Sequence, residues 1–97
     1  MAGTIMVNKK LLGRFRAAFK RYGSKVLGNP DIIVDFFPTE FEGYFGVFLT
    51  SPQFQSMPEA ERQDSVWGYL DTDPEITDDD LRFVTQIATE AKAVEFV

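Results

Sequence analysis

The chain has 97 residues, of which 44% are hydrophobic and ten are phenylalanine, so it supports one modest core. It contains neither cysteine nor histidine. These absences exclude disulfides, thiolate catalysis and cysteine-ligated zinc or iron–sulfur sites, and they remove the commonest general base. No apolar run approaches the roughly 20 residues that span a membrane, and the N-terminus lacks the hydrophobic segment of a signal peptide. We therefore expect one cytoplasmic domain over residues 1–97 that is not an enzyme and has no cofactor of its own.

Charge is segregated along the chain. Residues 1–30 carry seven of the ten basic side chains and no acidic one, whereas residues 31–97 carry all fifteen acidic side chains. The formal charge is therefore +7 in the first part and −12 in the second, which gives −5 in total. A basic helix favours nucleic-acid binding, because lysine and arginine release counterions from phosphate. The net negative charge instead favours a solvated helix face that pairs with the acidic remainder of the chain.

The first predicted element is a helix that Asn8 caps. Its apolar residues recur at helical spacing: Leu11, Leu12, Phe15, Ala18, Phe19 and Tyr22. Gly23 weakens this helix, and residues 28–30 (Gly-Asn-Pro) end any continuation of it. The basic residues occupy the other side. If the chain binds nucleic acid, we expect it to do so through Lys10, Arg14, Arg21 and Lys25.

Two β-strands follow, over residues 31–37 and 44–50, each rich in β-branched and aromatic residues. The loop of residues 38–43 between them is short enough for an antiparallel hairpin. In the second strand, Phe45, Val47 and Leu49 share one face, opposite residues 44, 46, 48 and 50. An exposed edge of this hairpin offers a route to a homodimer.

The next predicted element is a helix with Ser56 as its N-cap, Glu59 completing a capping box and Pro58 in the first turn. Its apolar side consists of Ala60, Val66, Trp67 and Leu70. Residues 71–80 form an acidic connector. Its Asp-x-Asp-x-Glu start resembles a calcium loop, but Ile76 stands where that loop needs glycine and Arg82 where it needs glutamate.

Two patterns compete over the last segment. Apolar residues at helical spacing, with a capping pair at Thr77 and Asp80, predict one helix over residues 78–95. Alternation from Leu81 to Ile87, with β-branched residues included, predicts a strand instead. A third strand would also complete a sheet that a lone hairpin cannot sustain.

The segment from residue 45 to residue 70 resembles the BolA-like family. That family's hallmark runs S-x-x-F-x-G, five residues, then R-H-x-x-(V/I)-(Y/F)-x-x-L. The matching residues here are Ser51, Phe54, Ser56, Arg62, Val66, Trp67 and Leu70. Ser56 replaces the family glycine, and Gln63 replaces the family histidine. The resemblance implies an α+β fold of class II KH-like type: a small three-stranded mixed sheet covered by helices in the order α-β-β-α-α-β. It favours a strand near residues 82–89 followed by a short terminal helix.

The resemblance also implies a partner. BolA-like proteins bind monothiol glutaredoxins in iron homeostasis and stress response, and some are described as regulators that bind DNA. Their ligands for a shared iron–sulfur cluster are a histidine at the start of the last strand, here near residues 82–83, and a cysteine or histidine in the loop equivalent to residues 38–43. Neither place holds such a residue. We therefore expect a protein-interaction module that binds a glutaredoxin-like partner without ligating a cluster, through Glu40, Phe41, Glu42, Arg62, Arg82 and Phe83.

Two alternatives remain open. Arg62 can be structural, anchoring the start of its helix to Glu59 or to the acidic connector. The whole chain can instead be a small regulator associated with nucleic acid through the basic first helix.

Overall fold

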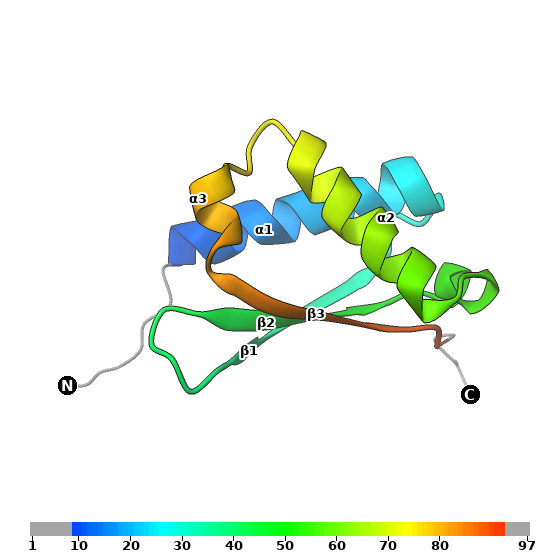
Figure 1. Ribbon diagram of the computed structural model, residues 1–97. Helices are drawn as coiled ribbons and strands as arrows, with labels where there is room; N and C mark the ends of the chain where they lie inside the picture. The colour runs from blue at the N-terminus through cyan, green and yellow to red at the C-terminus, as the bar shows by residue number, and fades with distance from the viewer. Residues whose placement is uncertain (1–8, 93–97) are drawn as a thin grey trace.

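The computed structural model describes residues 9–92, which fold into an α+β domain with the predicted element order. Helices α1 (Lys9–Tyr22), α2 (Glu59–Thr72) and α3 (Asp78–Leu81) pack on one side of a sheet formed by β1 (Ile33–Pro38), β2 (Phe45–Thr50) and β3 (Val84–Glu90), as Figure 1 shows. A π-helical turn, η1 (Gly23–Leu27), extends α1, and a 3-10 helix, η2 (Pro52–Ser56), precedes α2. The predicted cap Asn8 lies outside the described residues.

The sheet has the order β1-β2-β3 and is mixed. β1 and β2 form the predicted antiparallel hairpin, with Val34 opposite Leu49. β3 pairs with β2 in parallel, with Val47 opposite Ile87, because the chain from β2 to β3 crosses over the sheet through α2 and α3. The strand predicted near residues 82–89 is therefore confirmed, and a single helix from residue 78 is wrong. The predicted terminal helix would fall on residues 93–97, outside the described part.

The core lies between the sheet and the helices. The predicted inner face of β2 is confirmed, since Phe45, Val47 and Leu49 are buried. Within the described residues no helix covers the outer face (Figure 1), and Phe48 on that face is 36% exposed. Packed on the inner face are the apolar side chains of both long helices and η2: Leu11, Phe15, Ala18, Phe19, Tyr22, Phe54, Val66 and Leu70.

The prediction that Ser56 caps α2 is wrong. The N-cap is Pro58, and the Ser56 hydroxyl instead donates to the carbonyl of Gln53, 3.3 Å away, within η2. The cause lies upstream, because Ser51 caps η2 by accepting from the Gln53 N–H and so forms a separate 3-10 turn. The helix begins later than its sequence suggests, and Ala60 in its first turn is exposed. The capping box of Thr77 and Asp80 is confirmed at the start of α3.

The end of α1 is set by close backbone packing at Gly23. A Cβ atom there would lie 2.5 Å from the Asn29 carbonyl oxygen and 2.6 Å from a methyl carbon of Ile32. Gly28, with φ of 71°, then adopts the left-handed conformation that favours glycine and donates its N–H to the Gly23 carbonyl. These two glycines turn the chain from η1 into β1.

We predict opposite effects of alanine at two glycines of the first helical segment. Gly23→Ala should lower the free energy of unfolding by about 2 kcal/mol or more, because backbone must move to admit the methyl group. Gly13→Ala should raise it by roughly 0.5–1 kcal/mol, since Gly13 is exposed in α1 with open space around it. Denaturant unfolding of both variants measures the two effects. Equal effects of the two substitutions would contradict the packing at Gly23.

Candidate functional site

The loop between β1 and β2 and the start of β3 meet at one end of the sheet. They meet because β2 and β3 are parallel and begin side by side, with Phe45 opposite Val84 and the Phe45 N–H donating to the Phe83 carbonyl at 2.9 Å. The rings of Phe41 and Tyr44 lie 6.5 Å apart, and those of Tyr44 and Phe83 lie 5.4 Å apart. We call this region the loop-end surface; it comprises Glu40, Phe41, Glu42, Tyr44, Arg82 and Phe83.

Local hydrogen bonds hold the loop in shape. The Thr39 hydroxyl accepts from the Phe41 N–H and lies within 3.1 Å of the Tyr44 carbonyl, to which it can donate. The Tyr44 N–H donates to the Phe41 carbonyl, and Gly43 supplies a positive φ of 86°. The loop is thus braced while the Phe41 side chain remains 64% exposed. A large exposed aromatic ring on a braced loop is available for contact with another molecule.

Five of the six residues predicted to bind a partner lie on the loop-end surface, and Arg62 does not. The Arg62 Nε atom donates to the carbonyls of Met57 at 2.8 Å and Phe54 at 3.1 Å, and the guanidinium stacks over the Phe54 ring. Arg62 also approaches Thr89, six residues along β3 from Phe83, a separation of about 20 Å in a strand. Its contacts are those of the predicted structural anchor, made to Glu59 and η2 and not to the connector.

Sequence reasoning missed Tyr44, which joins the two halves of the loop-end surface. It was assigned only to a strand face, because nothing in the sequence shows that Phe83 lies beside it. One signal could have found it. In the predicted α-β-β-α-α-β order a helical crossover joins the second and third strands, which favours parallel pairing and sets Phe83 beside Tyr44.

The basic face of α1 pairs with the acidic connector. Arg21 makes a bidentate contact with Asp73, with Nη2–Oδ1 at 2.8 Å and Nε–Oδ2 at 3.0 Å, and Arg14 Nη2 lies 2.8 Å from Asp80 Oδ1. Both carboxylates belong to buried residues. Of the four residues predicted to contact nucleic acid, these two arginines are therefore already engaged. Lys10 and Lys25 are exposed near opposite ends of the segment from α1 to η1.

These ion pairs shift the acidity of the groups involved. Hydrogen bonding to Arg21 lowers the pKa of Asp73 to about 2 against the opposing effect of burial, and the same contact raises the pKa of Arg21. Burial alone would raise the pKa of Asp80, but the Thr77 backbone N–H and Arg14 outweigh it and lower the pKa. Both carboxylates are therefore ionised at neutral pH. Asp73, the central acid of the calcium-like stretch, has both oxygens occupied by Arg21.

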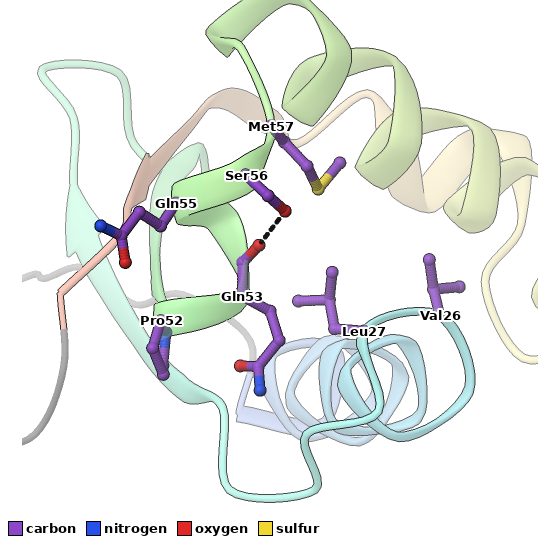
Figure 2. A pocket seen from close by; sticks show the side chains of 7 residues that line it. All are labelled: Val26, Leu27, Pro52, Gln53, Gln55, Ser56 and Met57. Carbon is purple, nitrogen blue, oxygen red and sulfur yellow. Dashed lines mark hydrogen bonds between the residues drawn. The ribbon is translucent and has the colours of Figure 1, made fainter.

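A shallow apolar hollow lies at the opposite end of the sheet from the loop-end surface. It is lined by residues of η1, η2 and the turn after η2: Val26, Leu27, Pro52, Gln53, Gln55, Ser56 and Met57. Met57 lies across the hollow from Val26 and Leu27 (Figure 2). None of these residues is titratable in the neutral range, so the hollow offers packing and amide hydrogen bonds and no acid–base chemistry.

Residues 9–92 contain no group of three or more acidic side chains placed to hold a metal ion. No helix in this part of the chain is long and apolar enough to cross a membrane. Comparison of the chain with protein-family models, with curated proteins and with solved structures gives no match.

We predict that Asp73→Asn destabilises the protein in a pH-dependent way. A fall in pKa from 3.8 to about 2 is nearly two units, which corresponds to about 2 kcal/mol of stability. Because the folded-state pKa is the lower one, this stability is present above pH 4–5 and is lost as the pH falls towards 2. The difference in free energy of unfolding between wild type and variant, measured by urea unfolding, should therefore shrink as the pH falls from about 5 towards 2. Asp71→Asn, at an exposed position, is the control and should change stability little at any pH.

Proposed function

We propose that this chain is a non-catalytic protein-interaction module, a divergent BolA-like domain, and that the loop-end surface is its contact with a protein partner. The observation that supports the proposal most is the continuous contact of Phe41, Tyr44 and Phe83, with Phe41 mostly exposed. Glu40, Glu42 and Arg82 around these rings are exposed charged residues. An aromatic centre with a polar rim is the usual composition of a protein–protein contact.

The first partner to test is a monothiol glutaredoxin-type protein. The support for this choice is the spaced motif of residues 51–70 together with the α-β-β-α-α-β order. Because the loop-end surface contains carboxylates and no thiolate or imidazole, this module would bind such a partner without supplying ligands to an iron–sulfur cluster.

The alternative of a nucleic-acid-associated regulator has less support. Arg14 and Arg21 contact Asp80 and Asp73, so their charges are largely compensated within the domain. Replacing either arginine by glutamate would also break a partly buried ion pair and place a second negative charge beside Asp80 or Asp73, which would destabilise the fold. A sharper test of this alternative is Lys25→Glu, at an exposed position of η1, which should weaken salt-sensitive binding without disturbing the fold.

We predict that Phe41→Thr weakens binding of a monothiol glutaredoxin by about tenfold or more, the effect of removing an aromatic anchor at an interface. The matched control is Phe48→Thr, which removes a second exposed phenylalanine on the open face of the sheet. The measurement is a backbone amide NMR titration of labelled protein with the apo and the cluster-loaded glutaredoxin. Shifts should fall in residues 38–44 and 82–84. Absence of shifts with both forms of the glutaredoxin would reject this partner. An equal loss of affinity in Phe41→Thr and Phe48→Thr would reject the loop-end surface as the binding site.

A further inference from the structure

The outer edge of β3 pairs with no other strand among residues 9–92. Within the described residues β3 pairs only with β2. Along a strand, successive residues direct their backbone N–H and C=O groups to opposite edges. The Glu90 carbonyl accepts from the Ser51 N–H, at the end of β2, whereas the Ile87 carbonyl accepts from the Gln63 side chain of α2 at 2.8 Å. The backbone groups of Ile87 and Thr89 therefore face away from β2.

Helix α2 runs beside this edge, and its side chains contact β3 at a regular spacing. Glu59 contacts Thr89, and Gln63, one turn later, contacts Ile87, two residues earlier. Four helical residues advance about 6 Å and two strand residues about 6.6 Å. Because these lengths are nearly equal, residues four apart in α2 stay aligned with residues two apart in β3. The result is a groove, which we call the α2–β3 groove, lined by Glu59, Gln63, Trp67, Thr85, Gln86, Ile87, Ala88 and Thr89.

The two edges of the sheet are protected unequally. On β1, Arg16 donates to the Val34 carbonyl at 2.9 Å, and Lys20 donates to the Ile32 carbonyl, so two successive outward carbonyls are held by cations from α1. On β3, one neutral amide, that of Gln63, occupies one carbonyl. Cations at a strand edge discourage pairing with another strand. The hairpin edge predicted to mediate a homodimer is thus the better protected one, and the β3 edge is the more accessible.

The surroundings of the groove favour a cationic occupant. Of the acids of α2, Glu59 lines the groove and Glu61 and Asp64 are exposed elsewhere on the helix. The single cation of α2, Arg62, lies 3.5 Å from Glu59, but its side chain folds back onto the carbonyls of Phe54 and Met57 and is only 17% exposed. Trp67 is half-buried in the groove and offers an aromatic ring, which attracts ammonium and guanidinium groups.

We propose that the α2–β3 groove binds an extended, lysine- or arginine-rich segment of a partner protein by strand addition to β3. The segment's backbone N–H replaces the Gln63 amide at the Ile87 carbonyl, and its cationic side chains face the carboxylates of α2. Main-chain pairing supplies the affinity and charge supplies the selectivity. This site is separate from the loop-end surface and does not depend on the function proposed for that surface.

The tryptophan gives a direct test. The chain has one tryptophan, and its indole N–H donates to the Gln63 side-chain oxygen at 3.1 Å, so displacement of Gln63 must shift the indole NMR signal. The probe is an acetylated, amidated peptide of alternating lysine and valine with the same seven-residue length as β3. We expect saturable shifts of the indole signal and of the Ile87 and Thr89 amides. Absence of these shifts at peptide concentrations up to about 1 mM, which corresponds to a weak specific contact, would overturn the proposal.

Control ligands separate strand addition from general attraction of charge. A probe with glutamate in place of lysine, and a lysine–valine probe N-methylated at alternate backbone nitrogens, should each bind at least tenfold more weakly. If the N-methylated probe bound as tightly as the unmethylated lysine–valine probe, strand addition would be overturned, since the methylated probe keeps the charges but lacks half of the backbone N–H donors. Tighter binding of a single-stranded oligonucleotide at the same residues would overturn the choice of a peptide.

A neutral substitution tests the role of Gln63. Gln63→Ala removes the amide that competes for the Ile87 carbonyl and leaves the net charge unchanged, so the lysine–valine probe should bind about threefold to tenfold more tightly, the scale of one hydrogen bond. Gln55→Ala, at an exposed position of η2, is the matched control and should leave the affinity unchanged. Unchanged or weaker binding by a folded Gln63→Ala protein would contradict the competition between the amide and the peptide.

Discussion

The bidentate ion pair between Arg21 and Asp73 is the interaction on which the arrangement of the domain depends most. It joins α1 to the acidic connector, and Arg14 with Asp80 repeats the connection two turns of α1 earlier. An acidic segment of this kind would otherwise be repelled by α2. Held against α1, the connector reverses the chain so that α3 and β3 return to the sheet (Figure 1).

The parallel placement of β3 produces both candidate surfaces. At its start, β3 sets Phe83 beside Tyr44 and so joins the loop of residues 38–43 to the turn after α3. Along its outer edge, β3 faces α2, and within residues 9–92 the Gln63 amide donates to the outward carbonyl of Ile87. Neither surface contains a cysteine or a histidine.

The segregation of charge in the sequence has two different outcomes in the fold. In the connector, Asp73 and Asp80 contact Arg21 and Arg14 of α1, and these contacts help to lower the pKa values of both carboxyls. Of the acids of α2, Glu59 lines the α2–β3 groove and lies 3.5 Å from Arg62 of the same helix, and Glu61 and Asp64 are exposed. A net charge alone would not distinguish the two groups of acids.

Local patterns in the sequence determined the hairpin, the inner face of β2 and the capping box at Thr77, because periodicity and turn residues act over a few neighbours. The α-β-β-α-α-β order was predicted from the resemblance of residues 45–70 and is confirmed. The local patterns placed the start of α2 wrongly, since residues 52–56 form a separate 3-10 helix that Ser51 caps and that contains the buried Phe54. The strand near residues 82–89 needed more than periodicity, as helix and strand patterns were both present. Only the tertiary structure decided which charges pair, that Tyr44 links Phe41 to Phe83, and which sheet edge remains open. Those outcomes depend on contacts between residues far apart in the chain, which no local pattern records.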